Sequence, residues 1–273
     1  MVGIGWVVVA AAVAGAVAGV QGQAAGRAVL AGVDHVPVAV RDLRQAGETY
    51  RRLGFVLKPG TPHANGISNL HAKFPDGTEI ELITVPRATD ALTTTYVEHL
   101  KQGDGPASLA FHAPDQAVAA QMFPREHPAR RYIFFGGLNR SPTDRPEHFQ
   151  HPNTAESLVS VWLAADDFSA ERDLLRRSNV PIATEDAFVP RPVSAPVVRF
   201  ERSSVVLLPA SHQRVAGRRI VGATVAVRSL GGAAQALRAG GIPPQALTTV
   251  SHVKSVFVSP DAAHGWWIEF REK

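Results

Sequence analysis

The sequence predicts an α+β fold in which β-α-β-β-β modules repeat and pair into two domains. Apolar residues switch between the two-residue period of strands and the 3.6-residue period of helices. This order recurs along the chain with a spacing of about 50 residues, a length at which each unit needs a neighbour to bury its apolar face. A stretch rich in Pro, His, Asn and Arg at 138–153 predicts a connector. We therefore expect domains at 29–150 and 151–273.

The first module, residues 33–84, shows the pattern most clearly. Asp42 is placed as the N-cap of a helix over 43–53 that ends at Gly54. The turn Pro75-Asp76-Gly77 predicts a hairpin. Its expected strands are 34–40, 55–58, 69–74 and 78–84.

Three weaker copies follow, at 107–136, 157–208 and 218–271. The second copy is short, with a strand over 108–113, a helix over 116–123 and one clear further strand over 132–135. The third has a strand at 159–164, a helix at 168–177 and a hairpin within 197–208. In the fourth we expect strands at 220–227, 255–258 and 265–270, with a helix over 230–239.

Composition excludes several functions. The chain has 45% hydrophobic residues and no cysteine, which rules out disulfides, thiolate metal sites and thiol nucleophiles. The net charge of +4 comes from Arg and Lys interleaved with carboxylates, so nucleic acid is not an expected partner. The sequence has no Gly-rich phosphate loop, no G-x-S-x-G and no HExxH.

Residues 1–28 are predicted to be a secretory signal peptide. No charge occurs from Met1 to Gly26, the run from Ile4 to Val20 is apolar, and small residues near Ala28 suit cleavage. The alternatives are an uncleaved membrane anchor and a start site assigned too early. The signal predicts an extracytoplasmic protein, periplasmic or secreted, whereas the anchor predicts a membrane-anchored one.

Strand alternation assigns the faces of the first module. Val36, Val38 and Val40 should pack on the helix, so that His35 points the other way. The same rule applies to the later strands of the module. Burying an unpaired carboxylate is costly, so the polar residues on the face opposite the helix call for an explanation. The residues expected to gather on one concave surface are His35, Asn69, His71, Glu79 and Glu81.

The segments VDHVPVAVRDLRQAGETYRRLGF and GTPHANGISNLHAKFPDGTEIELI resemble the vicinal oxygen chelate superfamily, in its glyoxalase-like branch. The resemblance is strong over 33–84 and weaker in the other modules. It implies two glyoxalase-like domains, each a pair of modules whose curved mixed sheets form a metal-holding cup. Members include glyoxalase I, extradiol dioxygenases, epimerases and metal-free proteins that sequester antibiotics. The fold therefore predicts the reaction poorly.

The resemblance places His35 and Glu81 as metal ligands. One imidazole and one carboxylate suit a divalent Fe, Mn, Zn or Ni ion. The alternative is a structural hydrogen bond between the two. The second module departs from the pattern, with Ser108 and Phe134 at the equivalent positions. We therefore expect His112 as the third ligand or as an acid/base group, with His71 as a local alternative and Glu79 or Glu81 moving a proton.

The C-terminal modules hold Ser160, Gly222 and Glu269 at the ligand-equivalent positions, which is too few donors for a catalytic metal. This half is interpreted as scaffold or as a second binding cup without chemistry. We expect Trp266 in the core, and Trp267 in the core or lining an apolar pocket.

Three further histidines are weaker candidates. His63 lies with Asn65 in a Gly-rich loop that could close over a substrate, although a solvated loop histidine is the simpler interpretation. His148 and His151 have HxxH spacing, but nearby Pro and Asn oppose a helical metal motif. We interpret their segment as an interdomain clasp.

Two functions follow. The first is a metal-dependent enzyme, a glyoxalase-like lyase or isomerase or an extradiol-type dioxygenase, acting on a small molecule with vicinal oxygens. The second is a non-catalytic, metal-free protein that binds or sequesters a small molecule. The resemblance also implies homodimers, and a membrane would be a partner only through an uncleaved N-terminal segment.

Overall fold

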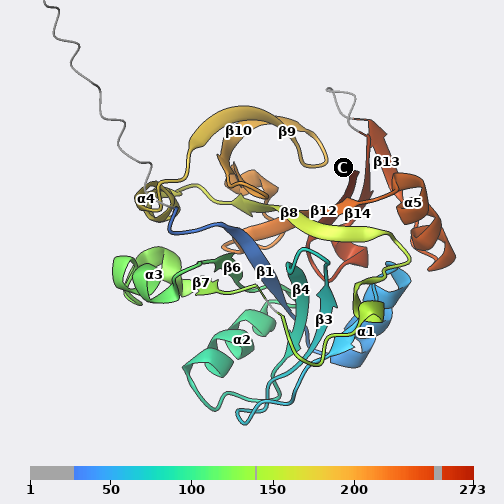
Figure 1. Ribbon diagram of the computed structural model, residues 1–273, viewed down its shortest axis with the longest axis horizontal. Helices are drawn as coiled ribbons and strands as arrows, with labels where there is room; N and C mark the ends of the chain where they lie inside the picture. The colour runs from blue at the N-terminus through green and yellow to red at the C-terminus, as the bar shows by residue number, and fades with distance from the viewer. Residues whose placement is uncertain (1–27, 139, 249–253) are drawn as a thin grey trace, which may run out of the picture.

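The computed structural model describes residues 28–138, 140–248 and 254–273 (Figure 1). The predicted signal segment lies outside this range, apart from its last residue. Among the helices of the described residues, none combines the length and the apolar character needed to span a bilayer.

The first sheet holds all the strands between Gly32 and Gly136. Its order is β2-β3-β4-β1-β6-β7, with the short β5 paired to β1. The first module thus supplies one half, and the shortened second module adds β6 beside β1 and β7 beyond β6. The strands are β1 (Gly32–Ala39), β2 (Lys58–Pro59), β3 (Ser68–Lys73), β4 (Glu79–Thr84), β5 (Gly105–Pro106), β6 (Leu109–His112) and β7 (Ile133–Gly136).

The second sheet has the order β13-β14-β15-β12-β8-β11-β10-β9. The third and fourth modules meet at the antiparallel pair β8–β12, and β9 and β10 curl round at one end of the sheet (Figure 1). The fold class is confirmed, with curved mixed sheets in both halves. The strands are β8 (Ala155–Ala164), β9 (Ile182–Phe188), β10 (Pro192–Arg199), β11 (Ser204–Leu208), β12 (Ile220–Val227), β13 (Gln245–Thr248), β14 (Lys254–Val258) and β15 (Trp267–Glu272).

The helices follow the first strand of each module. Asp42 caps α1 (Leu43–Arg52), with its carboxylate accepting from the amide of Gln45, as predicted. The other module helices are α3 (Gln116–Met122), α4 (Ser169–Arg177) and α5 (Leu230–Ala239), and short 3₁₀ turns lie at Pro128–Arg131, Pro146–Phe149, Ala210–His212 and Pro260–Ala262.

Five elements differ from the prediction. The predicted strand 55–58 is only Lys58–Pro59, because the amide of Val56 donates to the His151 imidazole instead of to a strand. Helix α2 (Ala91–Lys101) and strands β5, β9 and β13 were not predicted. Threonines weaken the helical pattern of α2, and β9 alternates poorly because it is a partly exposed edge.

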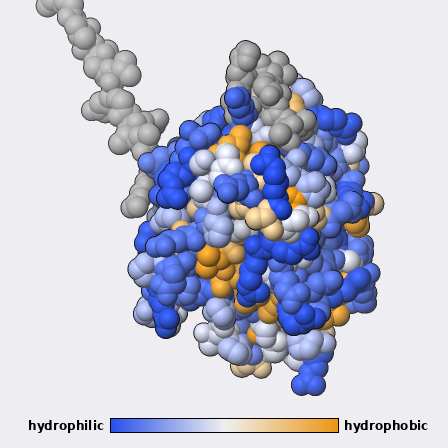
Figure 2. Space-filling model, turned by 90° about the vertical axis from the view of Figure 1, so that its right-hand side faces the viewer, coloured by the Kyte–Doolittle hydropathy of each residue, from blue (hydrophilic) through white to orange (hydrophobic). Residues whose placement is uncertain are grey.

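One apolar core joins the two halves. It contains the helix-facing residues of both sheets, including Val36, Leu82, Val161 and Trp266, together with Tyr50 of α1. The Trp266 indole donates to the Tyr50 hydroxyl at 2.9 Å, and both side chains are fully buried. The face in Figure 2 is mostly hydrophilic, broken by small hydrophobic areas. Because side chains alternate along strands, the opposite faces of both sheets point away from this core.

Candidate functional site

The first cup is the polar face of the first sheet, and it contains the residues that alternation predicted. Val36, Val38, Ile80 and Leu82 are buried in the core on the other side. His35 Nε2 lies 3.7 Å from Glu81 Oε2, and Asn69 donates to Glu81 Oε1 at 2.6 Å. His71 Nδ1 lies 3.0 Å from Glu79 Oε1. The structure therefore brings together His35, Asn69, His71, Glu79 and Glu81.

Asp34 joins this cup, although alternation put it on the opposite face. The pairing of β1 with β6 skips Asp34, and such a bulge turns an extra side chain out of the normal alternation. Its carboxylate is fully buried and lies 3.4 Å from His35 Nδ1, with neither oxygen in a hydrogen bond to a described residue. His35 thus stands between two carboxylates, Asp34 on its Nδ1 side and Glu81 on its Nε2 side.

These charges set the protonation of His35. Burial alone would lower its pKa, but the contact with Asp34 and the charges of Glu79 and Glu81 outweigh that effect and raise the pKa above its ordinary value.

The second module adds no donor opposite His35. Ala110 of β6 pairs with His35, and the Phe134 ring lies 5.2 Å from the imidazole between centroids. His112 pairs with Gly32, three residues from His35 along β1 and so roughly 10 Å away at the rise of a strand. The structure does not bring His112 to the His35–Glu81 pair, because the short module ends β6 at that position.

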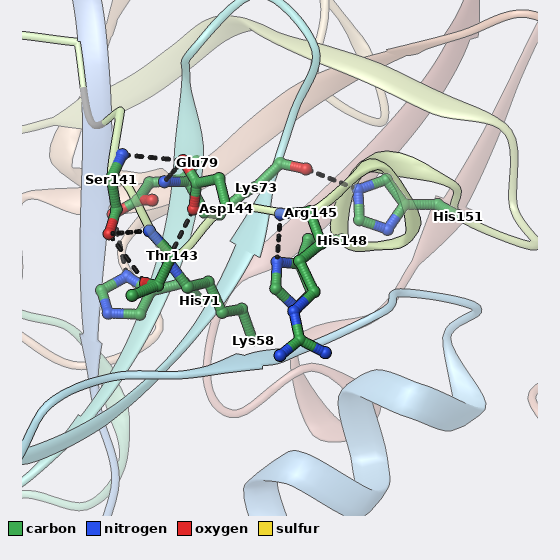
Figure 3. Close-up of polar contacts among 10 residues, drawn as sticks. All are labelled: Lys58, His71, Lys73, Glu79, Ser141, Thr143, Asp144, Arg145, His148 and His151. Atoms are coloured by element: carbon green, nitrogen blue, oxygen red, sulfur yellow. Dashed lines mark hydrogen bonds and ion pairs between the residues drawn. The ribbon is translucent and has the colours of Figure 1, made fainter.

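The first cup is closed from two directions. Tyr96 of α2 is buried near Glu81, and burial and this charge raise the pKa of Tyr96 to about 12. From the other side the connector inserts Asp144, which accepts from Lys58 at 2.6 Å and from Lys73 at 2.7 Å (Figure 3). The side chain of Lys73 is only 1% exposed, so this ion pair replaces water around a buried ammonium group.

The second cup is the equivalent face of the second sheet, and it is open. A cavity of about 630 Å³ lies between this face and the β9–β10 hairpin. Its floor carries hydroxyls, including those of Ser160 and Ser204, which hydrogen-bond each other at 3.0 Å. Its apolar walls include Trp162, Phe188, Val193, Val197 and Val206.

Glu269, the candidate ligand of this cup, is fully buried and saturated with donors. Arg271 donates to both of its carboxylate oxygens, at 2.8 and 2.9 Å. Thr224 donates to Oε2 at 2.6 Å and Ser255 to Oε1 at 2.5 Å. The Arg271 guanidinium thus supplies, beside Glu269, the positive charge that a metal ion would supply to a ligand carboxylate.

Gly222 stands where the first cup has His35, since both lie two residues before the β-strand partner of the glutamate. The Trp162 ring fills the space beside it: a Cβ at 222 would lie 2.3 Å from Trp162 Cε3. The residues of the second cup therefore do not fit a metal ion.

The first cup fits a metal ion in part. Two ligands of one ion at 2.0–2.2 Å lie roughly 3.0–3.6 Å apart, close to the 3.7 Å between His35 and Glu81. A carboxylate behind the second ring nitrogen, as Asp34 provides, is the usual support of a metal-binding histidine. However, no group of three or more His, Cys, Asp or Glu side chains among the described residues is arranged to hold an ion.

The remaining candidate histidines lie outside both cups. His63 is exposed on its loop. His148 Nδ1 accepts from the amide of Arg145 within its own turn. His151 accepts from the amide of Val56 and donates to the carbonyl of Lys73, and burial lowers its pKa. His151 therefore holds the connector to the first module, as a clasp, and Trp266 is in the core as expected.

A fold of paired modules with a polar cup on each sheet defines the class of this protein, and comparisons with known proteins agree. Residues 33–132 match a family model described as a glyoxalase-like domain. No curated protein matches.

Solved structures share the fold at low sequence identity. 4-Hydroxymandelate synthase from Streptomyces coelicolor, solved as a triple mutant, is 14% identical over 89% of this chain and 92% of its own, with a TM-score of 0.64. The Mn(II)-bound glyoxalase from Novosphingobium aromaticivorans is 10% identical over 89% and 82%, with a TM-score of 0.57.

A xylose isomerase-like TIM barrel/4-hydroxyphenylpyruvate dioxygenase fusion protein is 11% identical over 90% of this chain, with a TM-score of 0.64, and the chain spans 49% of its length. Residues 33–132 thus match a glyoxalase-like domain, and over most of its length the chain shares the fold of these solved structures.

Proposed function

We propose that the protein binds a small molecule in its second cup without a metal ion. The observation that carries this proposal is the 630 Å³ cavity whose lining includes Arg271, held from behind by the buried Glu269, and whose walls are aromatic and aliphatic. Concave sites with apolar walls and a few placed polar groups are the usual form of small-molecule sites. Glu269 has no coordination position left for an ion, and the ring of Trp162 takes the place of a second ligand.

Binding of 2-naphthol, followed by isothermal titration calorimetry, tests this proposal. Val193→Trp should fill the cavity and weaken binding at least about tenfold, which corresponds to ~1.4 kcal/mol. The matched control is Val118→Trp, on a 43% exposed position of α3, which should bind as the unmodified protein does. Absence of saturable binding, or equal affinity in the Val193→Trp variant, would contradict the proposal.

A second candidate function is a metal site in the first cup, favoured by the Asp34–His35–Glu81 arrangement. His35 and Glu81 would hold a divalent Fe, Mn, Zn or Ni ion, which would supply a Lewis acid for vicinal oxygens. Asp34 would orient the imidazole, and Asn69 would orient Glu81. In this candidate Glu79 and His71 remain the groups placed to move a proton or contact substrate.

Elemental analysis after reconstitution with each metal separates the two candidates. About one equivalent of metal that is lost in both His35→Ala and Glu81→Ala would establish the metal site. His112→Ala is the matched control, because His112 lies away from the pair and its loss should leave the metal content unchanged. A protein that stays metal-free after reconstitution would remove this candidate.

A sequestering role outside the cytoplasm, consistent with the predicted signal segment, remains part of our proposal. The N-terminal sequence of the protein secreted by an expressing cell would test it. A chain beginning near Ala28 is the expected result.

A further inference from the structure

The charges that line the second cup point to the chemical class of its ligand. This inference rests on the proposed function, since it concerns the same cavity. Two cations line the cavity, Arg199 and Arg271. Each guanidinium is already paired with a carboxylate, and this pairing determines how much positive charge remains available to a bound ligand.

The positive charge of Arg271 is neutralised by the buried carboxylate of Glu269. Its Nε donates to Glu269 Oε1 at 3.0 Å, and its Nη2 donates to both carboxylate oxygens. Glu269 is 0% exposed, so water screens this pair weakly and the two charges cancel at short range. An anionic ligand near Arg271 would meet the field of Glu269 a few ångströms behind it.

Arg199 is neutralised at the hairpin. Its Nε donates to Glu185 Oε1 at 2.8 Å, and the side chain of Arg199 is 62% exposed. The remaining charged residue of the lining is Asp186, which is exposed and negative. Within the described lining, no cation is left over for an anionic ligand, and the net charge is slightly negative when Glu269 is included.

The uncharged groups of the cavity can recognise a neutral ligand. The Ser160 and Ser204 hydroxyls line the floor as a hydrogen-bonded pair, and a hydroxyl pair has lone pairs free to accept. Phe188, which is partly exposed, offers a ring surface for stacking, and the buried Trp162 ring forms part of the wall. From this balance we infer that the second cup selects uncharged aromatic molecules bearing a hydroxyl or carbonyl group, and rejects the corresponding carboxylates.

The test compares 2-naphthol with 2-naphthoate by calorimetry at pH 7, where the first is neutral and the second anionic. The expected result is a preference for 2-naphthol of at least about tenfold. Equal or tighter binding of 2-naphthoate would overturn this inference and leave the proposed function standing. Failure of both probes to bind would overturn the two together.

A charge-releasing variant tests the role of Glu269. In Glu269→Gln the amide keeps the size of the side chain but leaves Arg271 unpaired, so affinity for 2-naphthoate should rise at least about tenfold. Glu48→Gln, which removes an exposed carboxylate paired with Arg44 on α1, is the control and should change neither affinity. Unchanged 2-naphthoate affinity in a folded Glu269→Gln protein would overturn the argument.

A second variant covers the case in which Glu269→Gln does not fold. Glu185→Gln releases Arg199 on the partly exposed hairpin, where the substitution disturbs no buried network. A smaller gain for 2-naphthoate, abolished by salt, is expected because the released charge is exposed. No gain at any ionic strength would count against charge pairing as the basis of the selection.

Discussion

At the scale of single residues, Gly222 decides what the second cup can hold. The close approach of Trp162 and of Trp267 leaves no room for a side chain at this position of β12. The first cup has His35 at the equivalent position, and its partner across the strand pair is the small residue Ala110 in place of Trp162. The difference between the cups thus rests on one pair of neighbouring side chains.

Gly222→Ala should lower the free energy of unfolding by about 1–3 kcal/mol, because the added methyl group must displace a packed indole ring. Denaturant unfolding measures the loss. Gly137→Ala is the matched control, since its nearest neighbour is the flexible end of Gln116 at 3.4 Å, and it should cost less than about 0.5 kcal/mol. Equal stability of the two variants would show that Trp162 has room to move.

Sequence reasoning located His35 and Glu81 but not Asp34 or Asp144. Alternation is a reliable guide while the strand is regular, and it placed Asn69, His71 and both glutamates correctly. The bulge at Asp34 breaks the period, and a single sequence carries no signal for it. Asp144 reaches Lys58 and Lys73 across more than seventy residues of chain, a contact that local patterns do not encode.

At the scale of elements, the connector is bound to the first sheet by charge. Burial would raise the pKa of Asp144, but the hydrogen bonds from Lys58 and Lys73 outweigh it and hold the pKa well below its usual range. The amide of Ser141 adds a third donor. A stretch that the sequence predicted as a plain connector therefore closes the first cup.

Asp144→Asn should lower the free energy of unfolding at pH 7 by about 2–3 kcal/mol, since two buried ammonium groups lose their counter-ion. Because the pKa is depressed in the folded state, this stability is present above the ordinary Asp pKa of about 3.9 and is lost as pH falls through the folded value. Unfolding measured from pH 7 to pH 2 should therefore show the difference between the two proteins begin to shrink below about pH 4 and go on shrinking down to pH 2.

The control for this change is Asp261→Asn. Asp261 pairs with Arg214, but its side chain is 75% exposed, and exposed pairs contribute about 0–1 kcal/mol. A pH-independent difference between Asp144→Asn and the unmodified protein would show that packing, and not charge, holds the connector.

At the scale of the whole molecule, the two halves should unfold together. The common core runs through both sheets, and the ends of α1 and α5 meet where Arg52 donates to the carbonyl of Gly240. A Cβ at Gly240 would lie 1.9 Å from the Arg52 carbonyl oxygen. Gly240→Ala should therefore push the halves apart at this contact.

Trp162, Trp266 and Trp267, the tryptophans among the described residues, all lie in the second half, so their fluorescence reports on that half and, through Trp266, on its contact with Tyr50. Far-ultraviolet circular dichroism reports on both halves. Gly240→Ala should lower the midpoint seen by the two probes equally, by an amount equivalent to about 1–3 kcal/mol. Gly231→Ala in the same helix is the control, because a Cβ there would meet only Ser229 Oγ, at an ordinary contact distance of 3.7 Å. Separate midpoints for the two probes would show that the halves unfold independently.

The shared core also has an evolutionary consequence. Both polar faces lie on the outside of a structure whose apolar centre belongs to neither cup alone. A substitution in one cup leaves the centre untouched, so one face can drift while selection acts on the other. Two cups on one shared core can therefore diverge within a single chain, as two proteins do after gene duplication.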